Sequence, residues 1–192
     1  IRGKAGTVVE LTLVRGGEVI ETPITRATIQ VPKTEDGLDT KSGVYHIALY
    51  EFTANSNSLF AQALRRFATS GSKKLVIDLR GNPGGYLVAA VNIAGRFLPK
   101  GTTVVTEDFD GKRASDVHTS AGYGGIPQGT KIVVLVDGGS ASASEILAGA
   151  LKDNGVATII GTKTFGKGSV QELVNLGEGS LKVTVARWVT PA

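Results

Sequence analysis

The spacing of apolar and polar residues divides the chain into short strands and helices. Residues 7–15 (TVVELTLVR) alternate apolar and polar side chains, and Gly16-Gly17 leads into a second alternating run over 18–31, a pattern that predicts a β-hairpin. Further strands are predicted at 42–52, 74–79, 102–107, 131–137 and 156–161. Apolar residues at helical spacing predict helices over 55–69, 86–98 and 138–155.

The order of these elements predicts an α/β fold. The runs KLVIDL (74–79) and KIVVLVD (131–137) are continuously apolar, as is typical of strands buried on both faces. Strands that alternate with helices form a right-handed, mostly parallel sheet, with ligand sites at the carboxyl ends of the strands. We expect 108–129 to be an exposed loop with room for a short strand pair, and 169–176 and 181–189 to close the fold as an antiparallel hairpin.

Length and composition narrow the function classes. The 192 residues, 41% apolar and 20% charged, suit one globular domain with an appendage. Lys and Arg (21) exceed Asp and Glu (17) by only four and are scattered, which argues against nucleic-acid binding. No apolar run reaches the roughly 18 residues of a membrane span. Because the chain has no Met, we expect it to be a processed product or an excised fragment.

Cysteine and histidine counts limit the available chemistry. With no Cys, the chain has no disulfide, thiol nucleophile or iron–sulfur cluster, and two His make a His-rich metal site improbable, so we expect neither metal nor cofactor. Glycine, in contrast, is abundant: 26 of 192 residues is about twice the usual share of roughly 7%. The glycines cluster in three loops after predicted strands, RGNPGG (80–85), DGGSASASE (137–145) and GTKTFGKGSVQ (161–171).

The middle loop offers a nucleophile. After the strand that ends at Asp137, two glycines permit a sharp bend and serines open a helix. The free N–H groups and partial positive charge of a helix N-terminus would stabilise an oxyanion beside a serine hydroxyl. The alternative is structural, because serine is a favoured N-cap and Ser142 or Ser144 could serve only as caps.

A serine nucleophile needs a base, and a lysine is the better candidate. His46 lies in a predicted strand and His118 in the exposed loop, so a Ser-His-Asp triad has few options. A lysine can act as a base only when its amine is neutral, which requires apolar enclosure. Lys167, between two glycines and next to Phe165, fits this better than Lys163, although in isolation it could be an ordinary solvated loop lysine.

Two other motifs are weaker. Residues 161–167 match the first seven positions of the phosphate-binding pattern GxxxxGK[ST], but Gly168 follows and the next pattern is a strand, where a phosphate site needs a helix. The S-x-x-K string at Ser70–Lys73 closes a helix instead of opening one. In RGNPGG, Pro83 and the glycines allow close backbone approach, which suggests a second N–H donor for an oxyanion or simply a tight turn.

Three segments together resemble the carboxyl-terminal processing proteases, a family of Ser/Lys-dyad serine peptidases. They are LVIDLRGNPGGYL, VLVDGGSASASEILAGAL and IIGTKTFGKGSVQ, in this order. The resemblance covers nearly the whole chain, since residues 1–15 are similar to the last strands of that family's PDZ domain and VTVARWVTP to its closing strand. It implies a crotonase/ClpP-like core of repeated ββα units at 23–192, and a remnant of a truncated PDZ domain at 1–22.

The resemblance also implies the site residues. Ser142 would be the nucleophile, Lys167 the general base, and Gln171 a partner that holds the lysine by a hydrogen bond. The backbone N–H groups of Gly85 and Ala143 would form the oxyanion hole, in agreement with the loop argument above.

The expected function is that of a serine endopeptidase that cleaves proteins near flexible apolar C-terminal tails, with the substrate bound as an added strand. Its partners would be such protein or peptide substrates, and a homo-oligomer is conceivable. The parent protein would work outside the cytoplasm, in a periplasm, cell envelope or lumen. Two alternatives stay open: a peptide-binding module or inactive fragment that lacks aligned catalytic groups, and a crotonase-type acyl-thioester enzyme that would bind coenzyme A.

Overall fold

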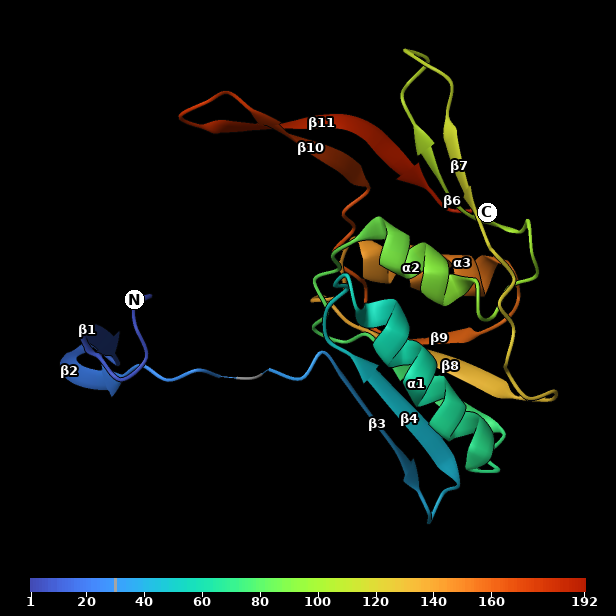
Figure 1. The fold of residues 1–192 in the computed structure, drawn as a ribbon, viewed down its shortest axis with the longest axis horizontal. Helices are drawn as coiled ribbons and strands as arrows, with labels where there is room; N and C mark the ends of the chain where they lie inside the picture. Colours follow the sequence, from blue (N-terminus) through green and yellow to red (C-terminus); the bar gives the residue numbers. More distant parts are fainter. Residues whose placement is uncertain (30) are drawn as a thin grey trace. The chain divides into compact units, whose positions relative to one another are not determined.

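The chain divides into two units. The structure, a computed structural model, describes residues 1–29 and 31–192, and contacts separate residues 1–32 from residues 33–192 (Figure 1). In the first unit, β1 (Val8–Arg15) and β2 (Glu18–Thr25) pair antiparallel around Gly16-Gly17, so the predicted hairpin is confirmed. Gln30, inside the range expected for its second half, lies outside the described residues. The contact boundary follows Pro32, whereas the sequence placed it after Thr22; the assignment of this unit as the end of a PDZ domain stays a prediction.

The second unit is built on a mixed, mostly parallel sheet, as expected. Its strands, in spatial order, are β3 (Thr34–Asp39), β4 (Val44–Leu49), β5 (Lys74–Asp78), β8 (Lys131–Val136) and β9 (Thr158–Gly161). β3 runs antiparallel to β4, and the other four strands are parallel. In β8 and in most of β5, buried side chains alternate with half-buried or exposed ones, because helices cover only one face of the sheet; the expectation that these strands are buried on both faces is therefore wrong.

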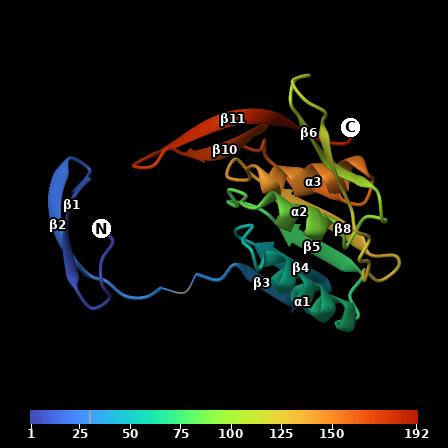
Figure 2. The same ribbon diagram turned by 45° about the horizontal axis from the view of Figure 1, so that its top comes forward.

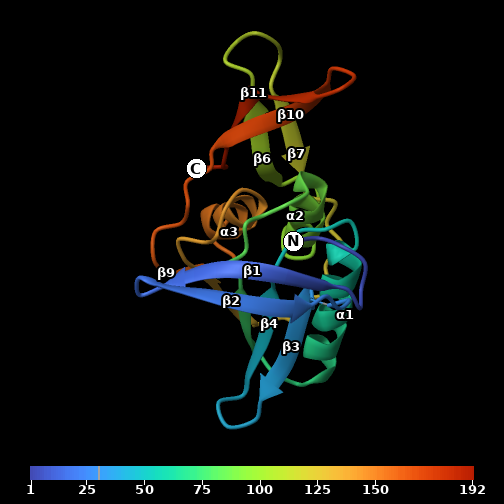
Figure 3. The same cartoon turned by 90° about the vertical axis from the view of Figure 1, so that its left-hand side faces the viewer.

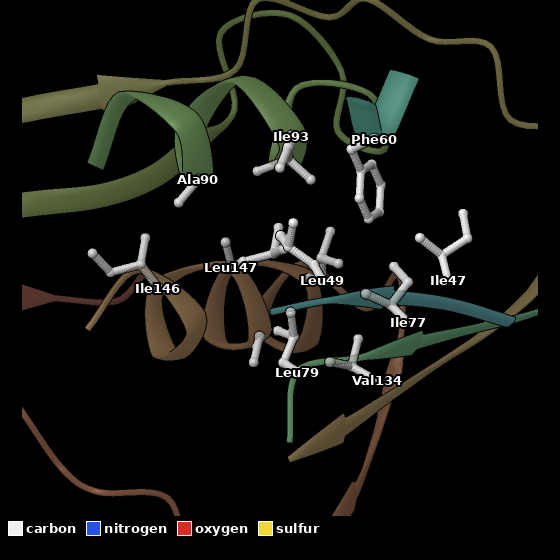
Figure 4. Close-up of a cluster of buried hydrophobic side chains, with 14 of the residues drawn as sticks. Ile47, Leu49, Phe60, Ile77, Leu79, Ala90, Ile93, Val134, Ile146 and Leu147 are labelled. Atoms are coloured by element: carbon white, nitrogen blue, oxygen red, sulfur yellow. The ribbon is translucent and has the colours of Figure 1, made fainter. Parts of the chain in front are cut away.

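Three helices lie on one face of this sheet (Figure 2): α1 (Ser56–Thr69), α2 (Leu87–Ala94) and α3 (Ala143–Asp153). The core forms where their apolar side chains meet those of the strands. Figure 4 shows Ile47, Ile77 and Val134 of the sheet facing Phe60 and Leu147 of the helices, and all five are fully buried. The carboxyl ends of β5 and β8 therefore lead into loops that lie directly beside the starts of α2 and α3.

A second sheet corrects the predicted topology. Residues 102–107 were expected as a strand of the main series, but β6 (Thr103–Asp108) leaves it and pairs with β7 (Asp116–Thr119) and with the C-terminal hairpin of β10 (Ser169–Asn175) and β11 (Ser180–Val189). The order is β10-β11-β6-β7, and Trp188 lies opposite Glu107. This sheet stands on the far side of the helices from the main sheet (Figures 1 and 3).

Two further differences have local causes. β3 was not expected, because TEDGLD carries neither β-branched alternation nor apolar run; it forms an edge strand by pairing with β4. α2 ends at Ala94 and not at residue 98. After it, the Arg96 and Phe97 N–H groups donate to carbonyls three residues back, and the Gly95 carbonyl accepts the Tyr123 N–H at 2.7 Å, because Pro99 has no N–H to continue the helix.

Candidate active site

The loops after β5 and β8 are fastened together by a carboxylate. Asp137 Oδ1 accepts hydrogen bonds from the Gly81 and Gly139 N–H groups, each at 2.8 Å. The Gly81 N–H is the main reason that the pKa of Asp137 is lowered. The backbones approach so closely that a Cβ at Gly139 would come within 2.8 Å of the Gly81 Cα. The two glycine loops predicted as neighbours therefore meet.

Asn82 fixes the inner side of the same junction and is fully buried. Its Nδ2 donates to the Leu49 carbonyl at 2.7 Å, and its Oδ1 accepts from the Gly84 N–H at 2.9 Å. Its own carbonyl accepts the Ala141 N–H and the Ser144 hydroxyl, both at 3.0 Å. One side chain and one carbonyl thus join the end of β4, the RGNPGG loop and the start of α3.

The backbone at Gly85 is arranged as an N–H donor facing the cleft. Phe52 pairs with this segment on one edge: its N–H donates to the Gly84 carbonyl and its carbonyl accepts from the Tyr86 N–H, both at 2.8 Å. Since successive N–H groups of an extended chain point to opposite sides, the Gly85 N–H points away from Phe52. Among the described residues it has no protein acceptor. Gly85 has φ +139°, and a Cβ there would collide with the Phe52 carbonyl oxygen, so only glycine fits.

The three serines of the middle loop have different environments. Ser140 and Ser144 are fully buried, and their hydroxyls donate to the Leu79 and Asn82 carbonyls. Ser142 is half-buried and adopts φ 55° and ψ −115°, a strained conformation for a residue with a side chain. A serine on such a sharp strand-to-helix turn presents its hydroxyl to the cleft. The capping alternative applies in part, because Ser142 is the N-cap of α3 and forms a capping box with Glu145.

Glu145 joins the serine helix to the lysine loop. Its carboxylate accepts the N–H groups of Ser142 at 2.8 Å, Gly166 at 2.6 Å and Lys167 at 2.9 Å. It also accepts the Thr164 hydroxyl at 2.8 Å. A carboxylate with four donors is well compensated for its partial burial. These hydrogen bonds to Glu145 set the position of the Lys167 backbone relative to Ser142.

The predicted site residues line one cleft of about 450 Å³, between the loops of the main sheet and the β10–β11 hairpin. Gly85, Ser142, Lys167 and Gln171 all face it, together with Trp188. Ala143, the remaining predicted residue, is the first residue of α3 and is buried next to Ser142. The pairing of β10 with β11 shifts after Val170: Val170 lies opposite Ala186 and Gln171 opposite Thr184, so the extra residue of this bulge is Val185 of β11.

Sequence comparison identifies the family. Residues 43–192 match peptidase family S41. The chain belongs to peptidase family S41. It is 39% identical over 192 residues to the probable CtpA-like serine protease of Staphylococcus epidermidis; this match spans 100% of this chain and 38% of the relative. It is 41% identical over 197 residues to the carboxyl-terminal-processing protease of Picosynechococcus sp.; this match spans 100% of this chain and 46% of the relative.

A solved structure agrees. The photosystem II D1 C-terminal processing protease matches this S41 chain with a TM-score of 0.77 and 34% identity, over 98% of this chain and 52% of that one. The resemblance predicted from the three motifs is therefore confirmed. The S41 chain spans about half the length or less of these relatives.

The histidines of this S41 chain lie outside the cleft. His46 Nε2 lies 3.2 Å from Asp78 Oδ2, and His118 Nε2 lies 2.9 Å from Glu107 Oε1. Burial alone would raise the pKa of Asp78, but hydrogen bonds from Arg80 and His46 hold it below its usual value. Neither imidazole is hydrogen-bonded to Ser142 in the described part of the chain, which disfavours a Ser-His-Asp triad.

The other weak motifs are settled by their context. Lys167 is followed by strand β10 and no helix, which removes the phosphate-loop reading. Ser70 caps the end of α1, and Lys73 Nζ donates to the Gln128 carbonyl at 2.9 Å, as expected for a surface turn.

In residues 1–29 and 31–192 no group of three His, Asp or Glu side chains could hold a metal ion. No helix within these ranges is long and apolar enough to cross a membrane.

Sequence reasoning missed the residues that hold the site in place, Asn82, Asp137 and Glu145. Beyond local contacts such as Asn82–Gly84 and Asp137–Gly139, their partners lie 19 to 62 residues away in the sequence, and no spacing rule reports these. The signal that was available was weaker: Glu145 stands three residues after Ser142, as a capping box requires.

Proposed function

We propose that this S41 chain is the core of a serine endopeptidase that uses a Ser142/Lys167 dyad. The observation that carries the proposal is the shared cleft, which is lined by a strained, half-buried serine, a half-buried lysine and a glycine whose N–H has no acceptor among the described residues. The residue roles come from the resemblance, and the geometry supports them. The finer fold assignment, a crotonase/ClpP-like core of ββα units with a PDZ remnant, is part of the same proposal and is supported by the β3–β4–α1 unit.

In the proposed mechanism, neutral Lys167 takes the proton of the Ser142 hydroxyl as Oγ attacks the scissile carbonyl. The negative charge that develops on the carbonyl oxygen is stabilised by the N–H groups of Gly85 and Ala143 and by the N-terminal end of α3. Lys167 then donates the proton to the leaving amine, and an acyl-enzyme remains on Ser142. Lys167 next activates a water that releases the acid, while Gln171 orients the amine.

The proposed substrates are proteins with flexible apolar C-terminal tails. Two similar proteins are carboxyl-terminal processing proteases by name, which supports this substrate class. We further propose that the parent protein acts outside the cytoplasm. Oligomerisation stays a proposal as well.

One observation favours a second candidate, a peptide-binding module. No hydrogen bond joins Ser142 Oγ to Lys167 Nζ among the described side chains, although both line the cleft. In that state the cleft would bind peptides without cutting them. A catalytic hydrogen bond can also form only when substrate is bound, so activity must be measured.

The test is cleavage of an unfolded protein by the wild type and by two variants. We expect Ser142→Ala and Lys167→Ala each to lower kcat/KM by about four orders of magnitude or more, because dyad members act as a unit. Lys163→Ala, which removes an exposed lysine of the same loop, should leave activity unchanged. The wild-type rate should rise toward alkaline pH, since a protonated amine cannot accept the serine proton. Cleavage that persists in Ser142→Ala would refute the proposal.

A further inference from the structure

Trp188 and Glu107 bring an indole and a carboxylate together on one wall of the catalytic cleft. They lie directly opposite each other on β11 and β6, the two middle strands of the second sheet (Figure 3), and the side chains of directly opposite residues share a face of a sheet. Both residues line the cleft of about 450 Å³ together with Ser142 and Lys167. The proposed mechanism uses neither of them.

The Glu107 carboxylate is held in place through only one of its oxygens. Its Oε1 accepts a hydrogen bond from His118 Nε2 at 2.9 Å, and the side chain is 15% exposed. Among the described residues, Oε2 accepts no hydrogen bond and no lysine or arginine forms an ion pair with this carboxylate. A carboxylate that has lost most of its water is best compensated by a charged donor, which forms shorter and stronger hydrogen bonds than a neutral one. The second oxygen is therefore available to a ligand in the cleft.

Trp188 supplies a complementary aromatic surface. Its side chain is half-buried and packs against the core, and its N–H donates to the Gly168 carbonyl at 2.8 Å, so the indole has a fixed base. No lysine or arginine of the described chain lies over its ring. Tryptophan is the aromatic residue that attracts a cation most strongly, and the aliphatic stem of a long cationic side chain packs on apolar surface. An indole beside a carboxylate therefore fits a lysine or arginine side chain.

The charges along the cleft also favour a cationic occupant. The charged residues that line it are Glu107, Glu172, Lys167 and Lys182. Lys167 is neutral when it acts as the base, so two carboxylates then face one ammonium group. Glu172 and Lys182 are exposed, and water screens their charges, whereas Glu107 is mostly buried. An acidic or uncharged side chain beside Glu107 would leave its carboxylate dehydrated and without a cationic partner.

The position of this wall indicates which half of the substrate reaches it. Lys167 must return a proton to the leaving amine, so the leaving half of the substrate lies on the Lys167 side of Ser142. Lys167 leads directly into β10, and β10, β11 and β6 belong to the same sheet. Trp188 and Glu107 therefore face the leaving half.

We propose that Glu107 and Trp188 form a binding site for one lysine or arginine side chain in the leaving half of the substrate. The inference rests on the proposed function, because that function defines the leaving half. It adds a specificity site on β6 and β11, in which Glu107 contacts the charge, Trp188 contacts the rest of the side chain, and His118 positions the carboxylate.

The first measurement is kcat/KM for fluorogenic peptides that carry one arginine at the first, second or third residue after the scissile bond. Each peptide is compared with one that has citrulline at the same place, since citrulline keeps the shape of arginine and lacks its charge. We expect arginine to exceed citrulline by about tenfold or more at one of the three positions, as is typical of hydrogen bonds to a charged group. Ratios below about twofold at all three positions would overturn the assignment.

The second measurement repeats these ratios in Glu107→Gln. Glutamine keeps an oxygen that accepts from His118, so the variant should fold, but it removes the charge. We expect the arginine-to-citrulline ratio to fall to within about twofold of one, because the arginine peptide loses its partner. Glu172→Gln, which removes an exposed carboxylate of the same cleft, should leave the ratio unchanged. A preference for arginine that survives Glu107→Gln would refute the site.

A binding measurement separates this site from the proposed function. Trp188 is the only tryptophan of the chain, so its fluorescence reports the binding of unlabelled, tryptophan-free peptides to the full chain carrying Ser142→Ala, with and without Glu107→Gln. If the wild type cuts none of the peptides, but arginine binds about tenfold more tightly than citrulline and Glu107→Gln abolishes this difference, the protease function fails and the cation site stands. If the arginine and citrulline peptides bind within twofold of each other, or if no peptide binds, the cation site is overturned.

Discussion

At the scale of single residues, the site depends on Glu145 as much as on the residues that would react. Its two carboxylate oxygens accept hydrogen bonds from four donors on α3 and the lysine loop. Both oxygens must be acceptors, because a backbone N–H group can only donate a hydrogen bond. Glu145 therefore couples the position of Lys167 to that of Ser142 without touching a substrate, as a positioning residue.

Glu145→Gln tests this coupling. The amide keeps the shape of the side chain, but its NH2 group cannot accept the hydrogen bonds that one oxygen now accepts. Loss of hydrogen bonds to a charged group, about 1.5–3 kcal/mol, should lower kcat by about tenfold to a hundredfold, with KM little changed. Steady-state kinetics measure the effect, and circular dichroism checks the fold. Glu178→Gln in the exposed turn between β10 and β11 is the control, and equal kcat in both variants would contradict the coupling.

The residues proposed to react were accessible from the sequence, and those that hold them in position were not. Ser142 and Lys167 stand out because glycines mark their loops and because the three motifs together resemble one family. Asn82 carries no such mark: it is one polar residue of a turn. Its hydrogen bonds with the Leu49 carbonyl, the Ala141 N–H and the Ser144 hydroxyl exist only after β4, the RGNPGG loop and the start of α3 have come together, so only tertiary structure reveals its role.

At the scale of elements, α1 is attached to the edge strand β3 by a charged contact. Arg66 of α1 donates from Nε to Asp36 Oδ2 at 2.9 Å, and the Tyr45 hydroxyl donates to the same oxygen. The Arg66 hydrogen bonds lower the pKa of Asp36, and burial raises the pKa of Tyr45 to about 12. The Asp36 side chain is only 8% exposed, so removal of its partners leaves a poorly hydrated charge.

Arg66→Ala should destabilise the protein by about 2 kcal/mol at pH 7, the typical value for hydrogen bonds to a charged group. The effect should depend on pH. Because the pKa of Asp36 is lowered in the folded state, its contribution is complete above the unfolded value of about 3.9 and is lost as the pH falls through the folded value. Urea unfolding over a series of pH values should therefore show the largest difference from wild type at pH 7 and a progressively smaller one as the pH falls below about 3.9.

Arg65→Ala is the matched control. Arg65 is the neighbouring exposed arginine of α1, and its side chain has no hydrogen bond or ion pair among the described residues. Its removal should change the free energy of unfolding by no more than about 0.5 kcal/mol. Equal effects of the two variants at pH 7 would show that the contact with Asp36 contributes nothing specific.

The sequence predicted correctly those helices and strands whose apolar residues recur with a strong helical or strand periodicity. The buried strands β5 and β8 and helix α1 lie within a residue or two of their expected ranges, since their apolar spacing reflects their own burial. Strand β3 was not predicted, because its stability comes from pairing with β4 and from the Asp36–Arg66 contact and not from its own sequence pattern. β6 was recognised as a strand but assigned to the wrong sheet, because alternation reports that a strand exists and not which partner it finds.

At the scale of the whole molecule, the two units differ in what stabilises them. In the described chain, the buried apolar residues all lie in the second unit, from Tyr45 onward. In the first unit, Val8, Val14 and Val19 are each more than half exposed. An isolated two-stranded hairpin is marginally stable in water, whereas a sheet covered by three helices unfolds cooperatively.

Amide hydrogen exchange of the full chain should separate the units. Amides of β1 and β2 need only local opening of the hairpin, which costs little, while amides of β5 and β8 need an opening that approaches global unfolding, about 5–15 kcal/mol. We therefore expect the hairpin amides to exchange at least about a hundredfold faster than those of the central strands. A chain that starts at Lys33 should keep the exchange rates of β5 and β8, since residues 33–192 form a compact unit with its own buried core. Equal protection of β1 and β5 in the full chain would mean that the hairpin belongs to the cooperative unit, and the division after Pro32 would then not describe how the protein unfolds.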